Sequence, residues 1–293
     1  MEIKASPPNF LSILEESYAQ EELERSKKPR EFRHNPSSAS FKKPDGTVIG
    51  ACLRNLYFRA TSEPESDPKT LTTKLQADFG NGIHDVVLKR LKDAKGMVLS
   101  PEAAGRAVVD PLTKEISYRL DGLVSYRGEL GGLEIKTKQS FAVQKYLKNG
   151  SPDETHLLQV LSYFGTNPDL RWFSLVYFAR DTAYRGEYHI YRDTESSDFL
   201  IESVTPKLRP KRITDLSFAG IVSRWRDLEL SVDKGLLPPR DFKAVLDKEG
   251  NVTDKRTKNY VEYKTDFQCA YCSWKTKCWS MEGKERDAKQ VSG

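Results

Sequence analysis

Long apolar stretches are missing from this chain. No run approaches the roughly 18 consecutive apolar residues of a membrane-spanning helix. The N-terminus begins Met-Glu-Ile-Lys and has no apolar core typical of a secretory signal. These absences argue against a membrane protein and against export, and they predict a protein of the cytoplasm.

Cysteine, histidine and unbalanced charge are also scarce. The 293 residues include four cysteines and four histidines, and 47 Lys and Arg against 42 Asp and Glu leave a net charge of only +5. So mild an excess permits nucleic-acid binding without arguing for it. No GxxxxGK[ST] loop is present, so a motor would have to be a separate subunit. Apolar residues at 38% and charged residues at 30% fit a soluble globular protein and exclude full disorder.

Helix and strand patterns alternate along the chain. Its length is near the limit for one hydrophobic core, so we expect one core with an elaborated surround, divided into residues 1–69, 70–195 and 196–293. The patterns predict, in order, a helix over 71–95, strands over 107–110, 116–124 and 130–136, a helix over 153–164, and strands over 172–178 and 186–191. Further helices are expected over 10–28, ended by Pro29, from about residue 52, and over 215–233. This order predicts an α/β fold with a mixed sheet and a helix on each side.

Two carboxylates and a lysine stand at the ends of neighbouring predicted strands. Asp121 precedes the Glu134-Ile135-Lys136 segment by 13 positions (134 − 121). Because strand side chains alternate, Glu134 and Lys136 share one face while Ile135 enters the core. Two converging carboxylates suit a hard cation such as Mg²⁺, and a nearby lysine stabilises developing negative charge. An isolated pattern of this kind is more often a pair of surface charges on a hairpin, so the pattern alone leaves both interpretations open.

Two additions make a site more plausible than surface charge. His84 closes the stretch Phe79-Gly-Asn-Gly-Ile-His84, one helix-strand unit before the carboxylates, where it could add a metal ligand. Gln159 and Tyr163 follow at a spacing of i, i+4, which places both on one helix face. Taken singly, the histidine is more often a core or surface residue, and the other two a polar helix edge.

The combined set resembles the nuclease motifs of the RecB-like branch of the PD-(D/E)XK superfamily. It consists of His84, Asp121, Glu134-x-Lys136 and Gln159-x3-Tyr163, in the order and rough spacing of that branch. The resemblance implies a restriction-endonuclease-like core over 70–195 and catalysis with Mg²⁺ or Mn²⁺. It implies His84, Asp121 and Glu134 as metal ligands, with the Ile135 carbonyl as a further contact. It also implies Lys136 as the catalytic lysine, and Gln159 and Tyr163 as residues that position DNA or the catalytic groups. Glu102 lies where such proteins sometimes carry an extra acid.

All four cysteines fall into a one-plus-three layout. Cys52 lies near the N-terminal side, and Cys269-x2-Cys272-x5-Cys278 lies near the C-terminal end. A redox CxxC pair would leave two of them without a role, whereas a four-thiolate metal site uses them all. Zinc and a [4Fe–4S] cluster both accept four thiolates, and spacing alone does not separate them.

This layout resembles that of the CRISPR-associated RecB-type nucleases and of AddB-like nucleases, which carry a [4Fe–4S] cluster. The Cys52-Leu-Arg54 segment and Tyr57 are similar to the start of those proteins. The resemblance implies a cluster that ties the N-terminal and C-terminal elements together across 217 positions (269 − 52). Such a clip would limit the unfolded ensemble, so its first role would be structural.

The sequence thus predicts a metal-dependent DNA exonuclease that acts on single-stranded or free DNA ends in recombination, repair, CRISPR adaptation or phage DNA metabolism. The expected partners are DNA, with a helicase or a recombination or adaptation protein as a separate subunit; ring-forming relatives leave a homo-oligomer open. Two rivals are a DNA-binding partner protein with a vestigial nuclease site and a zinc-stabilised nucleic-acid-binding module. A basic run over 207–212 contributes four positive charges, which are either a solvated loop or a phosphate contact. Lys138, two positions beyond Lys136 on the same strand face, could touch a phosphate near the cut.

Overall fold

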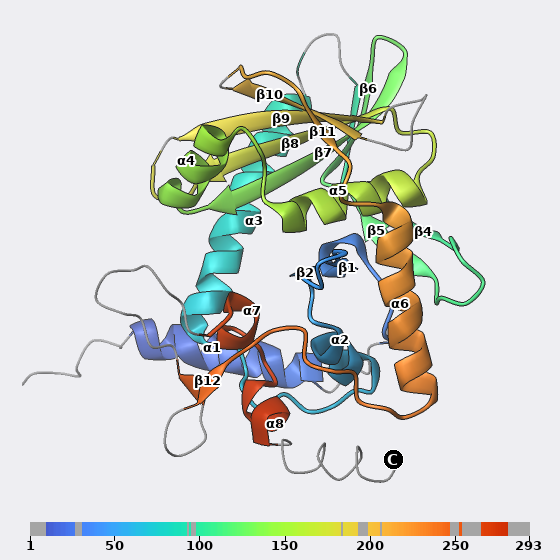
Figure 1. The fold of residues 1–293 in the computed structure, drawn as a ribbon. Helices are drawn as coiled ribbons and strands as arrows, with labels where there is room; N and C mark the ends of the chain where they lie inside the picture. Colours follow the sequence, from blue (N-terminus) through green and yellow to red (C-terminus); the bar gives the residue numbers. More distant parts are fainter. Residues whose placement is uncertain are drawn as a thin grey trace, which may run out of the picture.

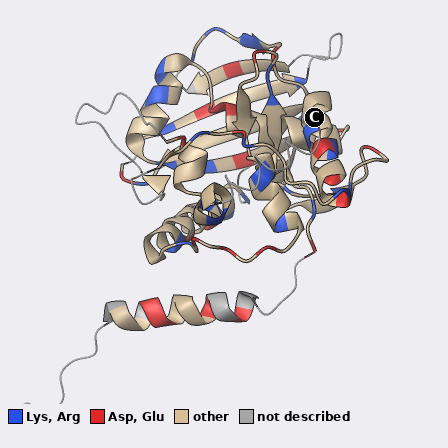
Figure 2. Cartoon of the chain, turned by 60° about the horizontal axis from the view of Figure 1, so that its bottom comes forward, with Lys and Arg blue, Asp and Glu red and all other residues tan. Residues whose placement is uncertain are grey.

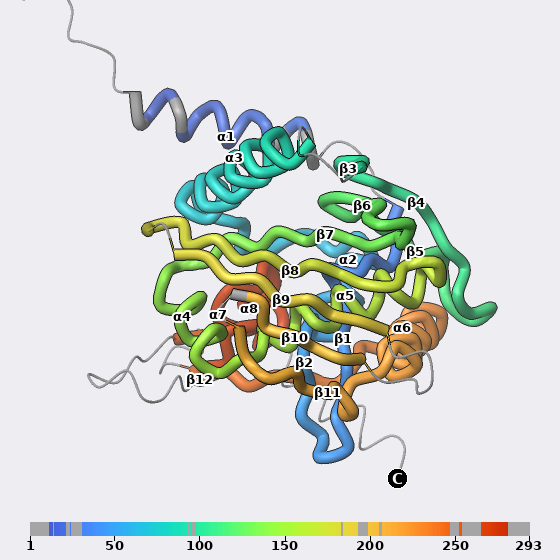
Figure 3. The backbone as a smooth tube through the Cα atoms, turned by 90° about the horizontal axis from the view of Figure 1, so that it is seen from above, coloured from blue at the N-terminus to red at the C-terminus, as the bar shows by residue number. Residues whose placement is uncertain are grey.

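The central feature of the computed structural model is a seven-stranded sheet with the order β11-β10-β9-β8-β7-β6-β3 (Figure 1). The structure describes residues 10–26, 31–92, 94, 98–182, 184–192, 199–205, 207–246, 252–253 and 265–280. The strands of this sheet are β3 (Val98–Pro101), β6 (Gly122–Tyr126), β7 (Glu129–Lys138), β8 (Trp172–Ala179), β9 (Arg185–Arg192), β10 (Phe199–Thr205) and β11 (Lys211–Ile213). The viewpoint from above shows them side by side (Figure 3).

The sheet is mixed, as the sequence predicts. Strands β7 and β8 pair in parallel, with Glu134 opposite Leu175 and Lys136 opposite Tyr177, whereas the other pairs are antiparallel. A parallel pair needs a crossover connection, and two helices supply it: α4 (Ser140–Asn149) and α5 (Glu154–Thr166). Helix α4 ends at Gly150, whose φ of 60° is the left-handed conformation that terminates many helices.

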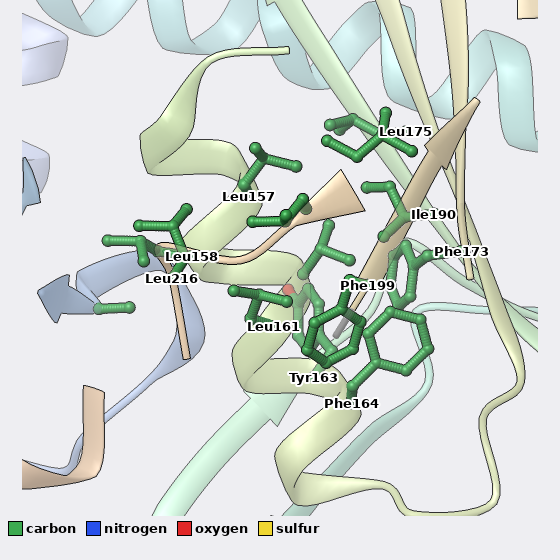
Figure 4. Close-up of a cluster of buried hydrophobic side chains, with 14 of the residues drawn as sticks. Leu157, Leu158, Leu161, Tyr163, Phe164, Phe173, Leu175, Ile190, Phe199 and Leu216 are labelled. Atoms are coloured by element: carbon green, nitrogen blue, oxygen red, sulfur yellow. The ribbon is translucent and has the colours of Figure 1, made fainter. Parts of the chain in front are cut away.

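Helices cover both faces of the sheet, so β7 lies in the middle of the fold. Helix α3 (Leu71–Lys92) crosses one face, and α4 and α5 lie on the other (Figures 1 and 3). The main core forms between α5 and strands β8, β9 and β10, as the close-up shows (Figure 4). A second apolar cluster joins Leu88 of α3 to Leu133 and Ile135 of β7. Alternate residues of β7 therefore face different layers, which places Ile135 in the core as predicted.

Smaller elements surround the sheet. They are α1 (Phe10–Ser26), a 3₁₀ turn (Pro36–Ser38), α2 (Leu53–Ala60), α6 (Phe218–Asp233), α7 (Phe267–Ala270), α8 (Lys275–Ser280), and the strand pairs β1–β2 (Ser40–Lys42 and Val48–Gly50), β4–β5 (Ala104–Ala107 and Ile116–Arg119) and β12–β13 (Val245–Leu246 and Val252–Thr253). Helix α6 packs against β1, α2 and α5. Among the helices that the structure describes, none is long and apolar enough to cross a membrane.

The segment that follows α2 lies beside the C-terminal helices (Figure 1). The Asp67 backbone N–H donates to the Ser273 carbonyl at 2.9 Å, and the Trp274 indole N–H donates to the Glu63 carbonyl at 3.0 Å. Phe58 and Trp274 are both buried in one apolar cluster with Cys278. The two ends of the fold are thus joined by hydrogen bonds and apolar contacts among these residues.

Two predicted strands differ from the structure. The strand expected over 116–124 is interrupted at Asp121: β5 pairs with β4 outside the main sheet, and β6 pairs with β3 and β7 inside it. The Leu120 N–H donates to the Ala103 carbonyl, and the Asp121 carboxylate accepts a hydrogen bond from the Ile135 N–H. The strand expected over 107–110 lies instead at 104–107, because the Asp110 carboxylate accepts the Leu112 N–H and starts a turn.

Other boundaries agree closely with the prediction, but the main sheet and its crossover contain elements that were not predicted. The expected helices over 71–95, 153–164 and 215–233, and the strands over 130–136, 172–178 and 186–191, are present with shifts of a few residues at their ends. In the main sheet and its crossover these are α4, β3, β10 and β11, and outside them the 3₁₀ turn, the short strand pairs β1–β2 and β12–β13, and the helices α7 and α8 are additional. Strands β10 and β11 extend the sheet past residue 195; the domain boundaries at 69 and 195 stay predictions.

Candidate active site

Strand β7 carries the glutamate and the lysine of the candidate site on one face. The Lys136 ammonium donates to Glu134 Oε1 at 2.6 Å. Glu134 is only 3% exposed, although it sits on the sheet among apolar residues. The alternation of the strand explains why the two side chains meet, because residues i and i+2 point the same way.

Helix α5 supplies the groups that hold this pair. The Gln159 carbonyl oxygen accepts from Lys136 Nζ at 2.8 Å, and its amide nitrogen donates to Glu134 Oε1 at 2.7 Å and to the Tyr163 hydroxyl at 2.9 Å. The Tyr163 hydroxyl donates in turn to the Arg119 carbonyl at 2.7 Å. The helical spacing of Gln159 and Tyr163 therefore produces a continuous hydrogen-bonded chain from β5 through α5 to β7.

Asp121 lies at the neighbouring edge of β7. Its Oδ2 accepts the Ile135 N–H at 2.7 Å and lies 3.5 Å from His84 Nδ1 on α3. The N–H and C=O of a strand residue point to the same edge, so the Ile135 carbonyl faces the same edge as Asp121. The Glu102 N–H donates to the Asp121 carbonyl at 2.9 Å, which helps to hold the bend between β5 and β6.

The electrostatics of the site follow from burial. Burial raises the pKa of Glu134, and nearby Asp121 adds to this, although the Lys136 ammonium opposes it. Burial and the charge of Glu134 raise the pKa of Tyr163, which keeps its hydroxyl protonated as a hydrogen-bond donor. The second carboxylate oxygen of Glu134, Oε2, is buried without a hydrogen-bond partner among the described residues.

This donor set bears directly on whether a divalent cation fits. Among the described residues, no three His, Cys, Asp or Glu side chains converge closely enough to form a closed metal cage. Mg²⁺ does not require such a cage, because it commonly keeps several waters and binds through one or two carboxylates plus a substrate phosphate. The unpartnered Oε2 of Glu134 and the carboxylate of Asp121 fit that mode of binding, with His84 beside Asp121.

A cleft of about 420 Å³ opens beside this site. Its lining includes His84, Ile135 and Lys136 from the predicted set, and Lys138, whose place on the strand face of Lys136 predicts a phosphate contact near the cut. The lining residues that sequence analysis did not assign to the site are Gln76, Ala77, Gly80, Asn81, Thr137, His156 and Arg180. No carboxylate is among these lining residues.

His156 could have been found from the sequence, because it precedes Gln159 by three positions on the same helix. Its Nδ1 lies 2.8 Å from the Tyr177 hydroxyl. Burial, with the positive charges of Lys136 and Lys138, lowers the pKa of His156 to about 3. The ring is therefore neutral at physiological pH. Arg180 lies 44 positions from Lys136 (180 − 136), and no local signal connects the two.

A larger hollow of about 570 Å³ lies elsewhere, between α3 and the strands on that face of the sheet. Apolar residues such as Val87, Leu133 and Trp172 dominate its lining. None of the predicted site residues lines it. The larger hollow and the predicted site residues therefore lie in different places.

The structure brings all four cysteines to one small cavity between α2 and the C-terminal helices. None of them is in a disulfide. The Asn55 amide and the Trp274 backbone N–H each donate to Cys272 Sγ at 3.4 Å, and the Arg54 guanidinium lies 3.7 Å from Cys278 Sγ. Hydrogen-bond donors directed at sulfur are the usual surroundings of metal-bound thiolates.

The surroundings of Cys52, Cys269 and Cys272 disfavour the ionised form of their thiols. Burial and the neighbouring cysteines raise the pKa of the Cys269 thiol to about 12, and burial also raises the pKa of Cys52 and Cys272. A reactive CxxC pair needs a lowered thiol pKa, so these directions do not favour a redox motif. The cavity measures only about 20 Å³. The donor set fits a metal centre, but a cluster would have to spread the side chains apart.

The basic run over 207–212 lies away from the cleft. Part of it forms the edge strand β11, which is four strands from β7 in the sheet order, or about 19 Å at the usual strand spacing. Its residues are exposed, and the Lys211 ammonium donates to the Asn149 carbonyl at 2.7 Å. Lysines on an edge strand discourage edge-to-edge association of sheets.

Comparisons with known proteins place the chain only loosely. No protein-family model and no curated protein matches it. Among solved structures, that of SSO0001 has a TM-score of 0.46 and 16% identity, covering 90% of this chain and 93% of that one. An alkaline exonuclease (LHK-Exo) from Laribacter hongkongensis has a TM-score of 0.39 and 12% identity, covering 62% and 78%. Its complex with dAMP has the same score and coverage at 15% identity.

Proposed function

We propose that the chain is a metal-dependent DNA nuclease of the PD-(D/E)XK type. The observation that carries the proposal is the hydrogen-bonded chain linking Lys136, Glu134, Gln159 and Tyr163, with Asp121 at the next edge of the strand. Removing a carboxylate and a lysine from water carries a desolvation penalty that their mutual attraction does not always offset. A buried pair of this kind is therefore consistent with a functional role. The unpartnered Oε2 of Glu134 is consistent with a site built for a cation.

Asp121, Glu134 and the Ile135 carbonyl would hold Mg²⁺ or Mn²⁺, with His84 as an added ligand. The bound ion would supply Lewis acidity toward a phosphate oxygen and a lowered pKa for water. Lys136 would contribute positive charge beside the phosphate that is cut. Gln159 holds that ammonium in place, and its own orientation is set by Tyr163.

The substrate proposal rests on charge and on the resemblance in sequence. The cleft presents Lys136, Lys138 and Arg180 and no carboxylate, which suits a polyanion. The resemblance to CRISPR-associated and RecB-type nucleases favours an exonuclease that acts on single-stranded or free DNA ends, with a helicase or an adaptation protein as its partner.

The four cysteines would hold a [4Fe–4S] cluster. This assignment rests on the resemblance in sequence and on the gathering of all four cysteines at one cavity. Four thiolates can ligate a [4Fe–4S] cluster. A zinc site is the alternative, and iron and sulfide analysis of anaerobically purified protein separates the two.

A cleavage assay tests the nuclease proposal. End-labelled single-stranded DNA should be cut with Mg²⁺ or Mn²⁺ and left intact with EDTA. Glu134→Gln and Lys136→Gln should each lower the rate by about 100-fold or more, the scale expected when a preorganised electrostatic group is removed. Glu129→Gln, an exposed glutamate at the start of the same strand, is the matched control and should cut normally.

Three outcomes would count against parts of this proposal. Full activity in the Glu134 or Lys136 variant would remove that residue from the site. DNA binding without cleavage in any metal would instead favour the DNA-binding partner protein. If the protein neither bound nor cut DNA, the assignment to nucleic acids would be rejected.

A further inference from the structure

The cleft is positively charged on its walls. Three of its lining side chains are cationic, namely Lys136, Lys138 and Arg180, and His156 is neutral because its pKa is so low. Lys136 is already paired with Glu134. The positive charges of Lys138 and Arg180 are therefore not explained by the proposed catalytic residues.

Lys138 is the more informative of the two. Its ammonium makes no hydrogen bond or ion pair to a residue that the structure describes. Burial lowers the pKa of Lys138, and the charges of Lys136 and Arg180 contribute, although Asp153 opposes them. A bound anion would relieve this repulsion. Lys136 and Lys138 are two residues apart on one strand, about 6.5 Å, which is comparable with the separation of successive phosphates on a nucleic-acid strand.

Arg180 is held beside Lys138 by the backbone. Its N–H donates to the Lys138 carbonyl at 2.8 Å, and its guanidinium donates to the Gln76 carbonyl of α3 at 3.2 Å. The β8–β9 turn is therefore tied to both walls of the cleft. This preorganisation is what a phosphate subsite requires, because the cations need not be collected when the ligand arrives.

An exposed phenylalanine begins the helix that follows Lys138. Phe141 in the first turn of α4 is 68% exposed. Its neighbour Ser140 donates from both its N–H (2.8 Å) and its hydroxyl (2.9 Å) to Asp181, the residue after Arg180. The phenyl ring is thus attached to the same rigid corner as the two cations. Figure 1 shows this corner where β7 runs into α4 at one end of the sheet.

We propose that Lys138 and Arg180 bind the phosphate next to the one that is cut, and that Phe141 stacks on the base of that nucleotide. The inference rests on the proposed nuclease function and specifies its substrate. Stacking on an aromatic ring requires a base that is free of its own neighbours, which an intact duplex does not offer. The strand that passes this corner is therefore unpaired.

Binding measurements without cleavage test the inference. Fluorescence anisotropy in EDTA would compare a labelled 12-nucleotide single strand, the same strand with one abasic position, and a blunt duplex. Phe141→Ala should weaken binding of the normal strand by about tenfold, the equivalent of removing one stacked base. It should change binding of the duplex, and of the strand whose abasic position occupies the corner, by less than about twofold.

The phosphate subsite has its own readout. Lys138→Gln with Arg180→Gln should weaken binding of normal and abasic strands alike. It should also flatten the dependence of log K on log salt by about 0.7 for each phosphate that the variant no longer neutralises. Phe141→Leu keeps the apolar bulk but not the ring, so it should behave as Phe141→Ala. The thermal unfolding of every variant verifies that it is folded.

A matched pair at the other end of β7 provides the control. Arg127 lies over the Tyr126 ring at 5.2 Å, just before β7 begins. Arg127→Gln and Tyr126→Ala therefore remove a cation and an aromatic ring at about 30 Å from Lys138, the length of the strand. Both should bind like wild type.

Each of the other outcomes has one consequence. Equal losses in the control variants, or an equal loss for Phe141→Ala on abasic and normal strands, would overturn the stacking role. An unchanged salt slope would overturn the phosphate subsite. If wild type neither binds nor cuts any of the DNAs, the nuclease proposal itself fails; if it cuts normally and these variants bind normally, only the present inference fails.

Discussion

The side chain of Gln159 joins three members of the candidate site. It accepts from Lys136 and donates to Glu134 and to Tyr163, so its amide orientation is determined by its neighbours. It is only 6% exposed. Loss of such an amide leaves buried polar partners unsatisfied, which is more costly than the loss of an exposed hydrogen bond.

Gln159→Leu should therefore lower the free energy of unfolding by about 1–3 kcal/mol and lower the rate of DNA cleavage as well. Gln144→Leu, on the exposed side of α4, is the matched control and should change stability by less than about 0.5 kcal/mol. Urea denaturation and the cleavage assay measure the two effects. A Gln159 variant as stable and active as the control would show that the hydrogen-bonded chain is not needed.

His156 makes the stability depend on pH in a defined direction. Its pKa is about 3 in the folded protein, against an ordinary value of 6.5. Between these values the unfolded chain takes up a proton that the folded chain does not, so stability is lost as pH falls from about 6.5 towards 3. The slope contributed by one such group is at most about 1.4 kcal/mol per pH unit.

His156→Gln should remove that contribution. Although the variant loses the hydrogen bond with Tyr177 and is less stable at pH 7, its free energy of unfolding should fall less steeply between pH values of about 6.5 and 4.5 than that of wild type. Urea denaturation at several pH values measures the slopes. Parallel slopes would show that the histidine titrates normally in the folded state.

Helix α3 approaches β7 through a glycine. A Cβ atom at Gly80 would lie 2.9 Å from the Thr137 hydroxyl oxygen, whereas one at Gly82 would meet nothing within 4 Å. Of the helix residues whose side chains the structure describes, only Gly80 and Leu88 are buried. Close contact at Gly80 is thus one of the few constraints that place His84 beside Asp121.

The two glycines should therefore respond in opposite ways to alanine. Gly82→Ala should raise stability by about 0.5–1 kcal/mol, because it removes backbone freedom at an open position of a helix. Gly80→Ala should lose this gain by moving α3 away from β7, and it should lower DNA cleavage through His84. The free energy of unfolding and the DNA cleavage rate of both variants test this expectation. If Gly80→Ala gained as much stability as Gly82→Ala and kept full activity, close packing at Gly80 would not be needed.

Across the protein as a whole, the N-terminal and C-terminal elements meet at the cysteine cavity. The Asp67 carboxylate accepts from the backbone and the hydroxyl of Thr276, and Arg240 donates to the Cys278 carbonyl at 2.6 Å. Figure 2 shows Lys and Arg interspersed with Asp and Glu along the cartoon, and ion pairs of Asp67 with Lys275 and of Glu63 with Lys277 add to the contacts between these ends. Protein contacts already join them, and a cluster would reinforce the joint.

Cys52→Ala should consequently reduce iron and sulfide content as much as Cys278→Ala does, although the two lie far apart in sequence. Both should lower the temperature of unfolding, since a missing ligand weakens the entire site. Ser280→Ala, at the end of α8, is the control and should keep a full cluster. Full iron and sulfide in Cys52→Ala would show that Cys52 is not a ligand and would end the one-plus-three interpretation.

Local periodicity fixed part of this protein directly. The two-residue repeat of a strand put Glu134 and Lys136 on one face, and the four-residue spacing of a helix put Gln159 and Tyr163 on another. The alternation of helix and strand patterns was enough to predict the mixed α/β sheet. These features depend on neighbours in the chain, which is why the amino-acid order alone contains them.

Where these faces meet was set by long-range packing. The interruption at Asp121 depends on the Ile135 N–H, 14 residues away, and the corner of Lys138, Arg180 and Phe141 depends on the pairing of β7 with β8. The basic run at 207–212 has strong charge but ends on a distant edge strand, while the isolated Arg180 reaches the cleft. Which residues far apart in the sequence become neighbours is determined by the packing of the whole core, and local sequence patterns do not indicate it.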